Sequence, residues 1–208
     1  AILLAAAEGN TPTYVQLRVT SASRLELAVE TFMRALDVNG LEHARAGIEI
    51  PADYPESAPL LRRLAGWAHL RREDGGSAIR VAVTRRPGVR TELAEAKLRS
   101  MPPLCYTKPE EVDANAVRLI DEVLSPEHHG TLELEVGINS RFDAALALQL
   151  ARKRGALAAV SVLVPEGTPR HLIEQLRDAG AAIRVRLGLL PESGPVSYTH
   201  LTLPTTPY

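Results

Sequence analysis

Short runs of β-branched and leucine residues alternate with longer amphipathic stretches along most of the chain. Six runs have the length of a buried strand and are bounded by turn-forming or polar residues. They cover residues 14–19, 46–50, 78–83, 131–138, 158–164 and 182–190. We therefore expect six β-strands.

Between these runs, apolar residues recur with the 3.6-residue period of an α-helix. In residues 23–37 the predicted apolar face holds Leu25, Leu27, Ala28, Phe32 and Leu36. The same period predicts helices over 57–73, 107–124, 142–155 and 169–180. Thr107 and Glu110 have the spacing of a capping box at the start of the helix predicted over 107–124. The elements thus follow a β-α order throughout.

A β-α alternation predicts a parallel sheet with right-handed crossovers, either a doubly wound sheet or a barrel. No G-x-G-x-x-G motif follows any predicted strand, which disfavours a doubly wound dinucleotide-binding fold. We expect an α/β fold of the (β/α)8 TIM-barrel type with about six βα units, truncated at both ends, because a full barrel needs about 250 residues. Its chemistry would lie at the carboxyl ends of the strands.

The two ends of the chain differ from the part between them. Residues 1–10 are predicted to be the last turns of a helix, so the chain is expected to begin within a domain. Residues 196–208 have no charged side chain and no period, and they resemble a translated sequencing adapter. We expect one barrel fragment over 1–195 and a non-native, disordered tail over 196–208.

Composition excludes several function classes. The net charge is -1 and aromatic residues make up 4% of the chain, so no nucleic-acid partner is expected. No apolar run reaches the ~20 residues that span a bilayer, so membrane contact is at most peripheral, through the basic face of residues 60–73, which we favour as an outer barrel helix. The single cysteine, Cys105, is expected to be buried, and it fits a reducing, cytoplasmic location.

Three groups of polar residues stand at predicted strand ends or turns. Arg85 and Arg86, with Arg90 near the start of a further helix from about residue 91, form either an anion site or a barrel rim that pairs with Glu92 or Glu95. Asn139 and Ser140 follow a strand, where they bind a ligand or, as we favour, cap a helix. His128 and His129 are expected to be solvated, and no metal site is predicted.

Two segments resemble the proline dehydrogenase barrel, especially the bacterial form fused to a glutamate-semialdehyde dehydrogenase. They are residues 75–124, which include "AIRVAVTRRPGVRTE", and residues 132–155, "LELEVGINSRFDAALALQLARKRG". The most specific part is "YTKPEEVDANAVRLI", in which Thr107, Lys108, Asp113 and Asn115 match the family pattern, with Glu92 matching upstream. The likeness extends from about residue 14 to residue 190.

The resemblance implies a (β/α)8 barrel that holds FAD and oxidises L-proline to pyrroline-5-carboxylate, the first step from proline to glutamate. It also implies electron transfer to a quinone and a fused or partner aldehyde dehydrogenase domain. Such a site needs basic groups that favour the reduced, anionic flavin and arginines that hold the substrate carboxylate.

At the positions that would do this work, the chain departs from the family. Arg18 stands where the family has an acidic residue, and Pro51 stands where a Gln would face the flavin. Ala82 replaces the flavin-contacting Arg. Arg85 keeps the charge of a Lys, whereas Arg86 replaces a Gly. The family's His-Asn pair falls on Asn139 and Ser140.

Three hypotheses remain at this point. The chain is a flavin-dependent proline dehydrogenase barrel, possibly degenerate in this copy, in which Arg85, Asn139, Ser140 and the position of Pro51 would face the cofactor. Alternatively, it is a non-catalytic barrel that makes structural contacts with an aldehyde dehydrogenase. A third hypothesis is a doubly wound ligand-binding module.

Overall fold

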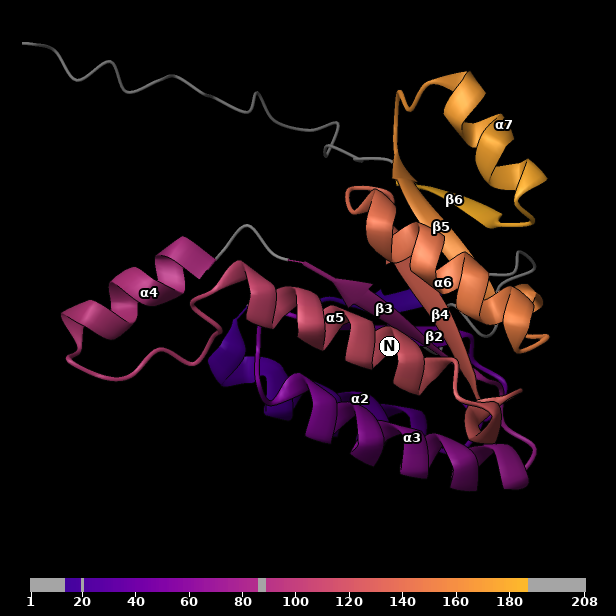
Figure 1. Ribbon diagram of the computed structural model, residues 1–208. Helices are drawn as coiled ribbons and strands as arrows, with labels where there is room; N and C mark the ends of the chain where they lie inside the picture. The colour runs from indigo at the N-terminus through magenta and orange to yellow at the C-terminus, as the bar shows by residue number, and fades with distance from the viewer. Residues whose placement is uncertain (1–13, 20, 86–88, 187–208) are drawn as a thin grey trace, which may run out of the picture.

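The computed structural model describes residues 14–19, 21–85 and 89–186. Within these ranges, six strands form one parallel sheet in the order β1-β2-β3-β4-β5-β6 (Figure 1). The strands are β1 Val15–Leu17, β2 Ala46–Pro51, β3 Ile79–Thr84, β4 Leu132–Gly137, β5 Val160–Pro165 and β6 Ala182–Arg186. Every strand pairs with the next one along the chain. The six predicted strands are therefore confirmed, with ends that differ by a few residues.

Helices connect the strands, and most of them cover the outer face of the sheet (Figure 1). They are α2 Leu25–Leu36, α3 Ser57–Glu73, α4 Val89–Leu98, α5 Pro109–Val123, α6 Arg141–Lys153 and α7 Arg170–Asp178, with short 3-10 turns η1 Ala22–Arg24, η2 Pro126–His128 and η3 Leu157–Ala159. Because the strand order never reverses, successive crossovers lie on one face, as in a barrel and unlike a doubly wound sheet. The described residues form a curled half-barrel, which confirms the predicted truncated (β/α)8 architecture.

The core lies between the convex face of the sheet and these helices. Alternate strand residues such as Ile48, Val81 and Leu134 point outward and are fully buried. They pack in one cluster with helix residues that include Leu61 of α3 and Ile120 of α5. Burial of these side chains accounts for most of the stability that holds the helices on the sheet.

The concave face of the sheet is polar, because the intervening strand residues point inward. One inward row runs through Gln16, Gly47, Arg80 and Glu133, which are paired across four strands. Arg80 donates to Glu133 at 2.6 Å. At Gly47 an added Cβ would lie 2.6 Å from the Arg80 carbonyl oxygen and 2.0 Å from the Tyr14 hydroxyl, so the backbone approach requires glycine.

Two local expectations are corrected by the structure. Leu27 is 66% exposed, because the buried face of α2 runs through Leu25, Val29, Phe32, Met33 and Leu36 instead. Helix α5 begins at Pro109 with Lys108 as its N-cap residue, one residue later than Thr107 would place it. The Lys108 N–H donates to the Glu111 carboxylate at 3.4 Å, so Glu111, and not Glu110, closes the first turn.

Other expectations concern residues that lie outside the described ranges. These are the predicted helix end before residue 14, the extension of the last strand beyond Arg186 and the adapter-like tail of residues 196–208. Among the described residues, no helix has both the length and the apolar character needed to cross a membrane.

Candidate functional site

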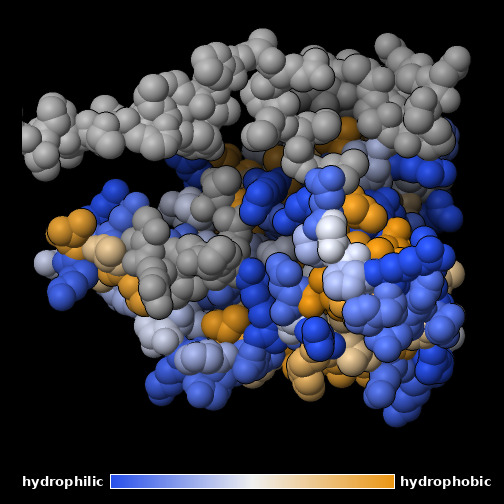
Figure 2. Space-filling model, turned by 90° about the horizontal axis from the view of Figure 1, so that it is seen from above, coloured by the Kyte–Doolittle hydropathy of each residue, from blue (hydrophilic) through white to orange (hydrophobic). Residues whose placement is uncertain are grey.

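A cavity of about 350 Å³ opens at the carboxyl ends of the strands, inside the curl of the sheet. Its wall includes Arg18, Ala82, Arg85, Asn139 and Ser140, five of the positions predicted from the family resemblance. In the view from above, most of the face that is not drawn in grey is hydrophilic (Figure 2). The structure thus brings these predicted residues together at one cavity. Their ion pairs and hydrogen bonds determine whether they are available to bind a ligand.

Arg85 follows β3 and is held by two aspartates. Its guanidinium donates to both oxygens of Asp143, at 2.6 and 2.7 Å, and also to Asp113. Asp143 lies in the first turn of α6 and is 5% exposed, whereas Asp113 belongs to α5. For Arg85, the predicted rim pairing with Glu92 or Glu95 is wrong, because its side chain reaches α5 and α6 instead.

This arrangement holds Arg85 in its charged form. The Asp143 hydrogen bonds raise the pKa of the guanidinium further above its ordinary value, Asp113 adds to the rise, and burial opposes it. Two carboxylates balance one cation, so the charge that a reduced flavin would need at this position is already compensated.

Ala82 lies between two buried carboxylates. It pairs in register with Glu49 of β2 and Glu135 of β4, which are 4% and 2% exposed. Arg18 and Arg186 approach Glu49 at 3.6 and 3.9 Å, and Arg184 approaches Glu135 at 3.5 Å. The side chain of Ala82 offers no donor, and the arginines near it face these glutamates.

Deeper on the concave face, Tyr14 lies between two arginines. The guanidinium carbons of Arg80 and Arg184 are 4.1 and 4.6 Å from the centroid of its ring. Burial raises the pKa of the Tyr14 hydroxyl, against the opposing effect of Arg80. Both arginines also contact glutamates, whereas the Tyr14 hydroxyl and the Nε and Nη1 atoms of Arg80 are buried without a hydrogen-bond partner among the described residues.

The remaining predicted cofactor positions have structural partners or face solvent. Pro51 is buried at the end of β2, and its carbonyl accepts a hydrogen bond from the Ser57 hydroxyl. Ser140 caps α6, since its Oγ accepts from the Asp143 N–H at 3.2 Å, which confirms the favoured capping role. Asn139 is exposed. Arg86 and the side chain of Arg90 lie outside the described residues, so the arginine cluster can be described only at Arg85.

The residues that carry the family resemblance hold the framework together. Asn115 is 1% exposed, and its Nδ2 donates to the carbonyls of Ala52 and Tyr54 at 2.9 and 3.2 Å. Glu92 of α4 accepts from the Ala22 N–H and the Tyr54 hydroxyl, both at 2.8 Å. Asp113 contacts Arg85. The residues that match the family pattern therefore connect loops and helices of the half-barrel through hydrogen bonds.

Sequence analysis missed Glu49, Glu135 and Asp143, although a signal for the two glutamates was present. In "GIEIP" and "LELEV", the glutamates alternate with apolar residues, and this alternation places them on the face opposite to those residues. Asp143 carries no comparable signal, because its partner Arg85 is 58 residues away.

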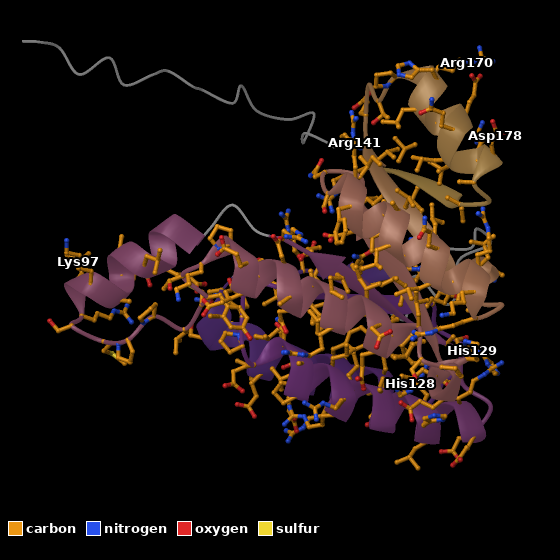
Figure 3. The ribbon with its side chains drawn as sticks, viewed as in Figure 1. Lys97, His128, His129, Arg141, Arg170 and Asp178 are labelled. Carbon is orange, nitrogen blue, oxygen red and sulfur yellow. The ribbon has the colours of Figure 1, made fainter. Side chains whose placement is uncertain are left out.

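The adjacent histidines differ in their surroundings. His128 is 7% exposed, which corrects the expectation that both are solvated, whereas His129 is exposed. His128 ends the 3-10 turn η2, which packs it beneath the end of α5 and beside His69 of α3, with ring centroids 5.9 Å apart. Figure 3 shows the two histidines near the lower end of the sheet.

Cys105 is 4% exposed, as expected for a buried small side chain. Burial raises the pKa of the thiol, and the negative charges of Glu92 and Asp53 raise it further. Because the thiolate is the nucleophile, we expect iodoacetamide to react with the folded chain near pH 8 several-fold more slowly than with the urea-unfolded chain. Quench-flow alkylation with mass spectrometry measures both rates. Equal rates would contradict this assignment.

Comparisons with known proteins agree with the half-barrel. No family model matches the sequence, and a search of the curated proteins finds no match. Proline utilization A (PutA) from Corynebacterium freiburgense is 26% identical with a TM-score of 0.81, over 86% of this chain and 19% of that protein. PutA from Bdellovibrio bacteriovorus, inactivated by N-propargylglycine, is 21% identical with a TM-score of 0.74, over 83% and 18%. A bifunctional PutA is 19% identical with a TM-score of 0.69, over 82% and 17%.

The second and third of these similarities bear on the fold alone, because their identities are low. The chain spans about a fifth of the length of the PutA structures that it matches. The chain has a PutA-like fold, which is consistent with a proline dehydrogenase domain, although the sequence identity is low. This similarity confirms the resemblance inferred from the sequence.

Proposed function

We propose that this chain is the proline dehydrogenase-like barrel of a PutA-type protein and that it has lost the FAD-dependent oxidation of proline. In this proposal the barrel is kept as a structural domain for a fused or partner aldehyde dehydrogenase, in the cytoplasm. The similarity to PutA supports the origin of the barrel. The charges around Ala82 and Arg85 support the loss of catalysis.

The residues present do not fit a flavin site. A reduced flavin is anionic, and a proline substrate carries a carboxylate, so both need cations that are free to bind them. Arg85 instead donates to Asp113 and Asp143. Ala82 offers no donor between the buried carboxylates of Glu49 and Glu135. The compensation of Arg85 by two aspartates is the observation on which the proposal rests.

The alternative is an active proline dehydrogenase that oxidises L-proline to pyrroline-5-carboxylate. Two observations at the carboxyl ends of the strands weigh against it. Arg18 and Arg186 both approach Glu49, so each already has an anionic neighbour beside the cavity. Pro51 has neither a side-chain donor nor a backbone N–H that could face the isoalloxazine ring.

The test uses the complete natural open reading frame that contains this chain, purified in the presence of added FAD. We expect no flavin absorbance in the protein after gel filtration and no proline-dependent reduction of a dye. PutA from Corynebacterium freiburgense, treated identically, serves as the positive control. A yellow protein that reduces the dye with proline would overturn the proposal and support the alternative, an active proline dehydrogenase.

A further inference from the structure

We propose that Glu122, Glu127 and His128 form a binding site for a divalent transition-metal ion of the Zn²⁺ class. The site lies at the amino end of β4, where α5 ends and η2 leads into the sheet. The cavity at the carboxyl ends of the strands is therefore at the other end of the sheet, and the proposed metal site does not depend on the function proposed for that cavity. Figure 3 shows His128 at this end of the molecule.

The spacing of the three side chains matches a metal better than it matches hydrogen bonds. The Nε2 atom of His128 lies 3.7 Å from an oxygen of Glu122 and 3.7 Å from an oxygen of Glu127. Both distances exceed the usual hydrogen-bond range. Ligand bonds of about 2.1 Å to a tetrahedral Zn²⁺ place neighbouring ligand atoms roughly 3.4 Å apart. All three ligand atoms lie within 4.8 Å of one another, so small side-chain rotations bring them onto one ion.

The environment of His128 supplies independent support. Its side chain is 9% exposed, and neither ring nitrogen has a hydrogen-bond partner among the described residues. A buried imidazole without partners loses the hydrogen bonds that it makes with water in the unfolded chain. Its Nε2 faces two carboxylates. An ion between the three groups satisfies this nitrogen and balances the two negative charges.

Neighbouring groups hold the proposed ligands in place. The Ser125 hydroxyl donates to the Glu127 carboxylate at 3.2 Å, and the His128 N–H donates to the Ser125 carbonyl at 2.9 Å. His69 Nε2 lies 2.8 Å from the carbonyl oxygen of Glu127. The Ser125 bond orients a proposed ligand carboxylate directly, and the other two bonds fix the turn that carries Glu127 and His128.

One nitrogen and two carboxylate oxygens suit Zn²⁺ or Co²⁺, with water at the remaining position. Solvent can reach the site, because the Glu127 side chain is 68% exposed and that of Glu122 is 30% exposed. A bound ion would join the end of α5 to the turn that starts β4, so its role would be structural. The thermal midpoint of unfolding should therefore rise when metal is added.

The test is a titration of the 208-residue chain with Co²⁺ after treatment with a chelator, followed by displacement with Zn²⁺. We expect saturable binding of one Co²⁺ per chain, with the visible absorption of a low-symmetry Co²⁺ centre, and its loss on addition of Zn²⁺. Loss of one outer-shell hydrogen bond weakens metal sites about 10–100-fold, so H128Q should weaken Co²⁺ binding at least about tenfold. E122Q should weaken binding in the same direction. Acidification should also weaken it, because protons compete for the imidazole.

H129Q is the matched control, because it removes the exposed neighbouring histidine and leaves the three proposed ligands in place. It should bind Co²⁺ like the unchanged chain. The far-UV circular dichroism of each variant shows whether it is folded. The proposal fails if the unchanged chain shows no saturable one-to-one binding, or if folded H128Q and E122Q bind Co²⁺ as tightly as the unchanged chain.

Discussion

Replacing Arg85 with Met is expected to lower the free energy of unfolding by about 3 kcal/mol. Asp143 is 7% exposed at its side chain and receives two hydrogen bonds from this guanidinium. Without Arg85, a nearly buried carboxylate loses its cation, and α5 and α6 lose a common partner. Urea denaturation monitored by circular dichroism measures the change.

The variant R170M is the matched control. Arg170 pairs with Glu174 on the surface of α7, with side chains 91% and 53% exposed, so its removal should change stability by less than about 0.5 kcal/mol. Adding Asp143→Asn to R85M should recover part of the loss, because the amide removes the uncompensated charge. Equal stabilities of R85M and R170M would show that the Arg85 pairs contribute nothing.

Replacing Asn115 with Leu is expected to lower the free energy of unfolding by about 2–3 kcal/mol. The side chain is buried in α5 and donates to the carbonyls of Ala52 and Tyr54 in the loop after β2. Leucine has a similar size but no donor, so the Ala52 carbonyl is left buried without this partner. Thermal and urea unfolding of N115L measure the loss.

Asn139 offers the corresponding control, because it is exposed beside the cavity. We expect N139L to unfold within about 0.5 kcal/mol of the unchanged chain. If N115L were as stable as N139L, the family-like segment around Asn115 would have no structural role in this chain.

The strands and most helices could be predicted because their signals are local. A run such as 46–50 alternates on a two-residue period, and its outward residues Ile48 and Ile50 are fully buried as that period requires. Leu27 shows the limit of the same method. Its position is compatible with an apolar face, but the sheet contacts the face that holds Val29 and Met33.

The partners of site residues could not be predicted in the same way. Glu92 and Glu95 are close to Arg85 in sequence, yet Arg85 pairs with Asp113 and Asp143 from two later helices. Such pairs depend on how crossovers stack against the sheet, and no local spacing encodes that stacking. His128 is a similar case, because its burial results from packing of η2 under α5 and beside α3.

The sequential strand order also bears on how the chain folds. Each strand pairs only with strands that are adjacent to it in the sequence order. Neighbouring βα units can therefore assemble one after another along the chain. The connection between β3 and β4 differs from the others because it contains two helices, α4 and α5. Closing this longest connection costs the most chain entropy, and β3 pairs with β4 only after it closes. We therefore expect the union of the β1–β3 and β4–β6 halves to set the rate at which the sheet forms.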